Sequence, residues 1–134
     1  MKFTVEHLGM AARDSVGLKE WYARVLGAEL VFDNGKKPGA FLLKLPGGLT
    51  LEIYPAEAVL AETGNNLLAG WRHLALQVDS IDSAKATLEA NGVNFTEPVK
   101  PAVGGGRVLF FRDPEGNLLH LVERNADSAI KPRA

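Results

Sequence analysis

The sequence predicts an α+β fold in which two repeated βαβββ modules form a curled mixed sheet with a concave site. The segment that begins at His7 (HLGMAARDSVGLKEWYARVLGAEL) and the segment that begins at His73 (HLALQVDSIDSAKATLEANGVNF) each read as a strand, an Asp-Ser step, a helix and a closing Gly. The two halves also end alike: PGGLTLEIY contains Glu52 and PEGNLLHLVE contains His120, each six residues after the proline. A stacked solenoid generally needs about three or more repeats, so two copies indicate a duplicated module.

The length and composition are those of one ordinary globular domain, which we place at residues 1–134. Of these 134 residues, 46% are hydrophobic and 23% are charged, a balance typical of folded proteins. We expect module one at about 1–55, a connector at about 56–70, module two at about 71–124 and an unstructured tail at 125–134.

The same counts exclude several classes of partner. With a net charge of −1 and a pI near 6.3, the chain lacks the excess of basic residues expected of a nucleic-acid-binding protein. Without cysteine the chain has no disulfides and no thiolate metal ligands. The N-terminus lacks a signal-peptide pattern, and no run approaches about 18 apolar residues. We therefore expect a cytoplasmic protein with neither nucleic acid nor a membrane as partner.

Capping and turn residues place the elements of each module. Asp14 or Ser15 is a suitable N-cap for a helix over Ser15–Leu26, and Gly27 is its expected left-handed stop. Ser80 caps a second helix over Ile81–Ala90. Turn residues separate eight expected strands, at 3–9, 29–32, 40–45, 49–54, 72–78, 93–95, 107–112 and 118–123. The connector is expected to be partly helical around 56–62.

Alternation along the strands separates the polar candidates from the aliphatic residues. Because strand side chains alternate with period two, Glu52 faces away from the layer that contains Leu51 and Ile53. His73 and His120 likewise oppose the leucines beside them. All three histidines of the chain, with Glu52, occupy repeat-related positions, and we interpret them as one metal site. The alternative is a metal-free pocket lined by imidazoles, in which Glu52 pairs with an arginine.

In this order, the motifs resemble the vicinal oxygen chelate superfamily, which includes glyoxalase I, extradiol dioxygenases and bleomycin-binding proteins. The resemblance covers about residues 3–124 and rests on EHLGM, LTLEIY, WRHLALQVD and DPEGNLLHLVE. It implies a glyoxalase-like fold, a homodimer, and a divalent metal ion held by His7, Glu52, His73 and His120.

The chain departs from the glyoxalase I pattern at three points. His120 stands where glyoxalase I, extradiol dioxygenases and fosfomycin enzymes usually carry Glu. The run Ile53-Tyr54-Pro55-Ala56 lacks the Asn that would hold glutathione, and no Arg lies close after His7 in the position expected for a glutathione carboxylate. These departures argue against lactoylglutathione formation.

The donor set fits several metals and one catalytic role. Three imidazoles and one carboxylate suit Zn, Ni, Co, Fe or Mn. Such an ion holds the vicinal oxygens of a small substrate, and Glu52 is the candidate catalytic base. Each histidine should have a partner on its other ring nitrogen, for which we expect Gln77 or a backbone carbonyl in the case of His73.

The leading functional hypothesis is a metal-dependent lyase or isomerase of glyoxalase type. One alternative is an Fe(II) extradiol-type dioxygenase, since two histidines and one carboxylate can form a facial triad. The other is a non-catalytic resistance protein that sequesters a drug or metabolite.

Further candidates line the expected cavity. Substrate-pocket candidates are Tyr54, Gln77, Phe41, Phe111 and Trp71, although aromatic residues on strands belong to the core more often. Gly104, Gly105 and Gly106 lack a phosphate-loop pattern, so we interpret them as a flexible flap. Lys100, Arg107 and Arg112 would suit an anionic substrate, but ordinary solvated charge is the favoured interpretation.

Overall fold

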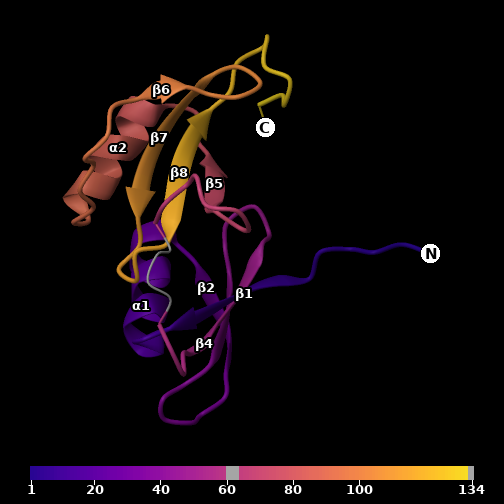
Figure 1. Cartoon of the computed structure of the whole chain (residues 1–134), viewed down its shortest axis with the longest axis vertical. Helices are drawn as coiled ribbons and strands as arrows, with labels where there is room; N and C mark the ends of the chain where they lie inside the picture. The colour runs from indigo at the N-terminus through magenta and orange to yellow at the C-terminus, as the bar shows by residue number, and fades with distance from the viewer. Residues whose placement is uncertain (60–63, 133–134) are drawn as a thin grey trace. The chain divides into compact units, whose positions relative to one another are not determined.

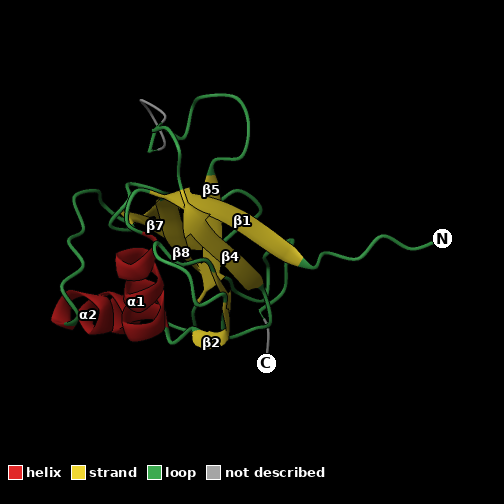
Figure 2. Cartoon of the chain, turned by 90° about the horizontal axis from the view of Figure 1, so that it is seen from below, coloured by secondary structure: helices red, strands yellow, loops and turns green. Residues whose placement is uncertain are grey.

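The structure is a computed structural model that describes residues 1–59 and 64–132 (Figures 1 and 2). The described elements are two four-stranded mixed sheets, each with one helix. The chain divides into two compact units, Met1–Ala61 and Glu62–Ala134, which we call unit 1 and unit 2. The predicted α+β class and the two repeated βαβββ modules are confirmed.

Unit 1 contains β1 (His7–Ala12), α1 (Ser15–Leu26), β2 (Glu29–Asp33), β3 (Phe41–Lys44) and β4 (Thr50–Pro55). Its sheet has the order β1-β4-β3-β2, with β1 and β4 parallel and the other pairs antiparallel. The predicted first strand, 3–9, begins too early, because residues 1–6 form an exposed extended segment before β1 (Figure 2).

Helix α1 begins and ends where its capping residues predict. The Asp14 carboxylate accepts a hydrogen bond from the backbone N–H of Gly17 at 2.9 Å, and Gly27 ends the helix at φ 69°. Leu18 and Tyr22 on its buried face belong to the core, and the helix packs chiefly against β4. This packing fixes the aliphatic face of the sheet as the inner face of the unit.

Strand alternation in unit 1 follows the prediction. Phe41, Leu43, Leu51 and Ile53 are buried, while Glu52 on the opposite face of β4 is only partly buried. One face of this sheet therefore forms the core, and the other carries the candidate ligands.

Unit 2 contains β5 (His73–Gln77), α2 (Ile81–Ala90), β6 (Lys100–Pro101), β7 (Arg107–Arg112) and β8 (Leu118–Glu123), in the sheet order β5-β8-β7-β6. Figure 1 shows α2 along β7 and β8, on which it packs. Ser80 caps α2 as predicted, its hydroxyl accepting from the Ser83 N–H at 3.2 Å. Glu123 adds a second cap, accepting the Ile81 N–H at 2.8 Å, and it also pairs with Arg107 at 3.0 Å.

The predicted strand at 93–95 is wrong. Val93 is buried and the Phe95 ring lies 5.6 Å from that of Phe111, so this segment contributes side chains to the core without joining the ladder. The strand at this place in the module is the short β6. Pro101 is the last residue of β6, and Pro98 lies two residues before the strand. Because proline has no N–H to donate to a ladder, the two prolines limit the length of β6.

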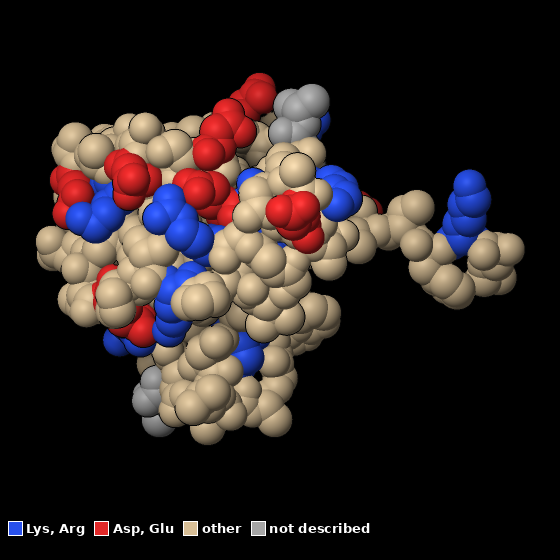
Figure 3. Space-filling view, turned by 90° about the horizontal axis from the view of Figure 1, so that it is seen from above, with Lys and Arg blue, Asp and Glu red and all other residues tan. Residues whose placement is uncertain are grey.

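The predicted connector helix is absent over residues 56–59, and its remainder, 60–62, lies outside the described residues. No helix within residues 1–59 and 64–132 is long and apolar enough to cross a bilayer. On the face shown in Figure 3, acidic and basic side chains are interspersed.

The tail and the triple-glycine loop are more ordered than predicted. Ser128 is fully buried, and its hydroxyl accepts from the Asn125 N–H at 3.0 Å. The Ala129 N–H donates to the carbonyl of Gly104 at 2.7 Å. Arg124 donates to two further carbonyls of the same loop, at 2.6 and 2.7 Å. The tail as far as residue 129 therefore fastens this loop, which the flap interpretation had taken as free.

Candidate functional site

In unit 1, the parallel pairing of β1 with β4 places His7 and Glu52 on one face of the sheet. His7 is in register with Thr50, and Gly9 is in register with Glu52, so the two candidate ligands are offset by two residues along the ladder. A Cβ atom at Gly9 would lie 3.4 Å from the Tyr54 ring and 3.8 Å from Glu52 Oε1. Glycine at this position thus leaves the surface beside the Glu52 carboxylate open.

Unit 2 repeats this arrangement with two histidines. His73 is in register with Leu118, and Ala75 with His120, which is the same offset as in unit 1. The two imidazole rings are 4.6 Å apart between centroids. Phe110 on β7 packs against both, at 5.6 Å from His73 and 4.9 Å from His120. The duplication seen in the sequence therefore extends to the strand register of the candidate ligands.

Each of the three histidines has its Nδ1 beside an oxygen acceptor. The partners are Glu6 Oε1 for His7 at 2.7 Å, Asn66 Oδ1 for His73 at 2.7 Å, and the Leu121 carbonyl for His120 at 3.1 Å. A carboxylate, an amide oxygen or a carbonyl can only accept, so Nδ1 carries the proton in each ring. The lone pair on Nε2 is left to bind a metal, the arrangement usual for metal-binding histidines.

The partner of His73 corrects a prediction. Gln77 or a backbone carbonyl was expected, but the Asn66 side chain fills this position. Asn66 lies seven residues before His73, in a segment without helix or strand periodicity. No pattern in the sequence marks it as a neighbour of the imidazole.

Burial favours the neutral form of His120, which is only 6% exposed. Desolvation chiefly lowers the pKa of its imidazole, against a smaller raising effect of the Leu121 carbonyl, and the electrostatic interactions with His73 and Arg124 lower it a little further. Because metals bind neutral imidazole, this environment prepares His120 as a ligand at neutral pH.

The donor chemistry of each pair is of the kind that first-row divalent metals bind. Within the described ranges, no group of three or more His, Asp or Glu side chains is close enough to hold an ion. The candidates instead occur as two pairs, His7 with Glu52 in unit 1 and His73 with His120 in unit 2. Nitrogen and oxygen donors of this kind suit Zn, Ni, Co, Fe or Mn.

The predicted pocket residues divide between the two faces. Phe41 and Phe111 are buried on the aliphatic faces, so the structure places them in the cores of their units, away from the candidate ligands. Tyr54 is partly exposed on the Glu52 face, and Gln77 lies half-buried on the His73 face. Trp71 is 92% exposed and does not line the pocket found in the described part of unit 2.

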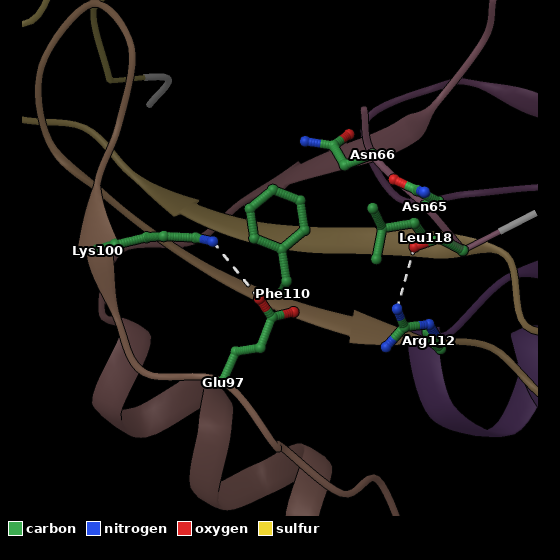
Figure 4. Close-up of a pocket in the computed structure, with 8 residues that line it drawn as sticks. Asn65, Asn66, Glu97, Lys100, Phe110, Arg112 and Leu118 are labelled. Carbon is green, nitrogen blue, oxygen red and sulfur yellow. Dashed lines mark hydrogen bonds and ion pairs between the residues drawn. The ribbon is translucent and has the colours of Figure 1, made fainter. Parts of the chain in front are cut away.

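A pocket of about 340 Å³ adjoins the histidine pair of unit 2 (Figure 4). Two of its lining residues are shared with that pair: Phe110 packs on both imidazoles, and Asn66 accepts from His73. The lining residues are Gly64, Asn65, Asn66, Glu97, Lys100, Phe110, Arg112 and Leu118. Of these, only Lys100 and Arg112 were among the residues singled out in the sequence.

The family sequence model of the Glyoxalase/Bleomycin resistance protein/Dioxygenase superfamily matches residues 4–121 of this chain. The chain belongs to this superfamily. Among the relatives of the chain, the uncharacterized protein YaeR of Escherichia coli is 30% identical over 123 residues, covering 90% of this chain and 95% of YaeR. A probable lactoylglutathione lyase of Vibrio parahaemolyticus is 26% identical over 117 residues, covering 82% of this chain and 83% of the lyase.

Solved structures of the superfamily share the fold. A glyoxalase family protein from Enterococcus faecalis has a TM-score of 0.75 and 29% identity, covering 90% of this chain and 97% of that protein. The fosfomycin resistance protein FosX of Listeria monocytogenes, solved with Mn(II) and dihydroxypropylphosphonic acid, has a TM-score of 0.70 and 19% identity, covering 95% and 94%. At that identity, the likeness to FosX shows the fold alone.

Proposed function

We propose that this superfamily member is a metal-dependent lyase or isomerase of glyoxalase type that acts on a small substrate with vicinal oxygens. In this proposal His7, Glu52, His73 and His120 ligate one divalent ion. The reaction class is supported by the superfamily and by a probable lactoylglutathione lyase among the relatives.

The observation that carries the proposal is the shared state of the three histidines. Each has Nδ1 bound to an oxygen acceptor and Nε2 left with a lone pair, although the three acceptors come from a carboxylate, an amide and a backbone carbonyl. This is the state that a metal-binding histidine needs, because the partner on Nδ1 fixes both the tautomer and the ring orientation.

A bound divalent ion would supply Lewis-acid polarisation of the substrate's oxygens. The residues of the chain have separate tasks around this group. Glu52 is the carboxylate among the proposed ligands and the candidate to accept a proton from a carbon beside a polarised carbonyl. Gly9 keeps the approach to its Oε1 free of a side chain. Phe110 packs against both imidazoles of unit 2.

The first test measures metal content by mass spectrometry on untagged protein that has not met a chelator. We expect a near-stoichiometric first-row metal that is lost in both His73→Ala and His120→Ala. The matched control is Gln77→Ala, which changes another polar side chain on the same face of β5. Protein that stays metal-free after reconstitution with Zn, Ni, Co, Mn and Fe(II) would overturn the proposal in favour of a sequestering protein.

The second test examines the role of Glu52. Glu52→Gln should abolish turnover of hydroxy-carbonyl substrates, while Glu29→Gln on the exposed strand β2 should leave turnover unchanged. Full activity with full metal occupancy in Glu52→Gln would exclude its role as base and as ligand.

A ferrous dioxygenase is the second candidate, because the proposed set contains one carboxylate together with histidines. It requires oxygen uptake that depends on Fe(II) and on a catechol-type substrate. An oxygen electrode separates it from the lyase, whose reaction consumes no oxygen.

We also propose that the protein is a homodimer, as the superfamily resemblance implies. Mixing metal-free His7→Ala with metal-free His73→Ala tests how the ligand set is distributed. If two copies share the site, each mixed dimer regains one intact site, which after random exchange gives about one metal per four chains, whereas no recovery would mean that each chain supplies its own.

A further inference from the structure

The sequence offered three cations for an anionic substrate, and the structure separates them. Arg107 is paired with Glu123, through contacts of 3.0 to 3.2 Å, and does not line the pocket of unit 2. Lys100 and Arg112 line that pocket together. Lys100 and Arg112, and not Arg107, are therefore the cations that could meet an anion in this pocket.

The charge of the pocket is not neutralised within it. Glu97 is the carboxylate among the lining residues, and its Oε1 is 3.5 Å from Lys100 Nζ, at the limit of hydrogen bonding, with both side chains partly exposed. Two cations and one carboxylate leave a net charge of +1 on the lining. A chain with a net charge of −1 thus concentrates positive charge beside its candidate metal ligands.

Each cation is held in place by a contact other than a close ion pair. Lys100 Nζ lies over the Phe110 ring, 4.8 Å from its centroid. Arg112 Nη2 donates to the Gly64 carbonyl at 3.0 Å, which uses one of the five N–H groups of the guanidinium. Figure 4 shows Phe110 between Lys100 and the side that carries Asn66 and Leu118. The lining thus combines two cations with two apolar side chains, Phe110 and Leu118.

We propose that the substrate of this site carries a carboxylate or a phosphonate-type oxyanion, bound by Lys100 and Arg112, on an apolar body that lies against Phe110 and Leu118. The identification of this ligand as the substrate rests on the proposed function. The binding of the anion does not, since every lining residue belongs to unit 2 and none is a proposed metal ligand.

The probes are three small molecules with the same ring: phenylphosphonate, phenylacetate and the neutral benzyl alcohol. Each is titrated into chelator-treated protein while backbone amide shifts are recorded. We expect the anions to shift the amides of Asn66 and Phe110 and to bind at least about tenfold more tightly than benzyl alcohol, as charge-assisted contacts with two cations would give. The anion that binds more tightly identifies the class of oxyanion.

Lys100→Gln is the test variant, and Lys85→Gln is its matched control. Lys85 also pairs with a glutamate, Glu89 at 3.2 Å, and also lies over an aromatic ring, Phe95 at 5.7 Å, but it does not line the pocket. We expect Lys100→Gln to weaken anion binding about fivefold, a modest loss suited to a half-exposed cation, with no change for benzyl alcohol. Lys85→Gln should change neither.

Three results would overturn the inference: no shift of these amides with either anion, binding of benzyl alcohol as tight as that of the anions, or an equal loss in both lysine variants. Metal content is measured on the same samples. A chain that takes up metal but binds neither anion refutes this inference alone. A chain that binds the anions but never metal refutes the proposed function and leaves the oxyanion pocket standing.

Discussion

Asn66 provides a sharp test of the metal proposal, because it is not a proposed ligand and would affect metal binding only through its hydrogen bond to His73. Its amide oxygen accepts from His73 Nδ1 at 2.7 Å. In Asn66→Ala this acceptor is lost, so the imidazole can rotate and its other tautomer becomes accessible, in which Nε2 carries the proton and cannot bind metal. The expected effect is weaker metal binding with all four proposed ligands still present.

The size of the effect follows from the exposure of the pair. Loss of a hydrogen-bonded partner of a metal-binding histidine typically costs 10- to 100-fold in affinity. Both His73 and Asn66 are exposed, so water can replace the lost oxygen, and we expect the lower end of this range. Tenfold weaker binding corresponds to about 1.4 kcal/mol.

The assay is competition of the protein with a fluorescent zinc chelator, which gives the metal dissociation constant. Asn65→Ala is the matched control, since Asn65 also lines the pocket but its side chain accepts from the Leu67 N–H instead of a histidine. Asn66→Asp should restore or strengthen binding, because a carboxylate is a better acceptor for the imidazole N–H. Equal losses in the two alanine variants, or no loss in Asn66→Ala, would refute the reasoning.

Three further predictions concern the stability of the units. The Ile81 N–H, chiefly, and Arg107 lower the pKa of Glu123, so its stabilisation is present above the usual carboxyl range and is lost as pH falls through the lowered value; urea denaturation should show Glu123→Gln less stable by about 1 kcal/mol at neutral pH and by less near about pH 3, and an equal difference at both pH values would contradict this. Gly106→Ala would drive a Cβ into the Glu123 carbonyl, whereas Gly47→Ala, at a similar φ, meets nothing within 4 Å; we expect Gly106→Ala to cost at least about 2 kcal/mol more in the same assay, and similar losses would rule out the collision. The Ala129 N–H, bonded at 2.7 Å, should exchange with solvent more slowly than the amide of Ile130, and equally fast exchange would show that the tail is loose.

Local signals were enough to predict the helices and the faces of the strands. Asp14 and Gly27 fix the ends of α1 through contacts within one turn of the chain, and Ser80 does the same for the start of α2. The alternation around Glu52 was equally readable, because a register shift of one residue would bury the carboxylate and expose Leu51. The repeat then predicted which strand positions of the two modules correspond.

The features that sequence reasoning missed depend on contacts between distant residues. Phe95 lies in a segment whose residues favour a strand, yet its ring packs against Phe111. The strand pairing forms later in the chain, at Lys100. The tail looked polar and structureless because its order comes from Arg124 and the glycine loop about 20 residues away. Asn66 is separated from any regular element, so its contact with His73 has no periodic signal.

The pairing of the first strand of each unit with its last has a consequence for how the protein acquires its metal. Glu52 follows His7 by 45 residues and His120 follows His73 by 47, so neither pair exists until nearly a whole module has left the ribosome. Until its first module is complete, a growing chain therefore offers an ion an isolated imidazole and no chelating pair. Under the proposed ligand set, the choice among competing cellular metals falls to folded modules.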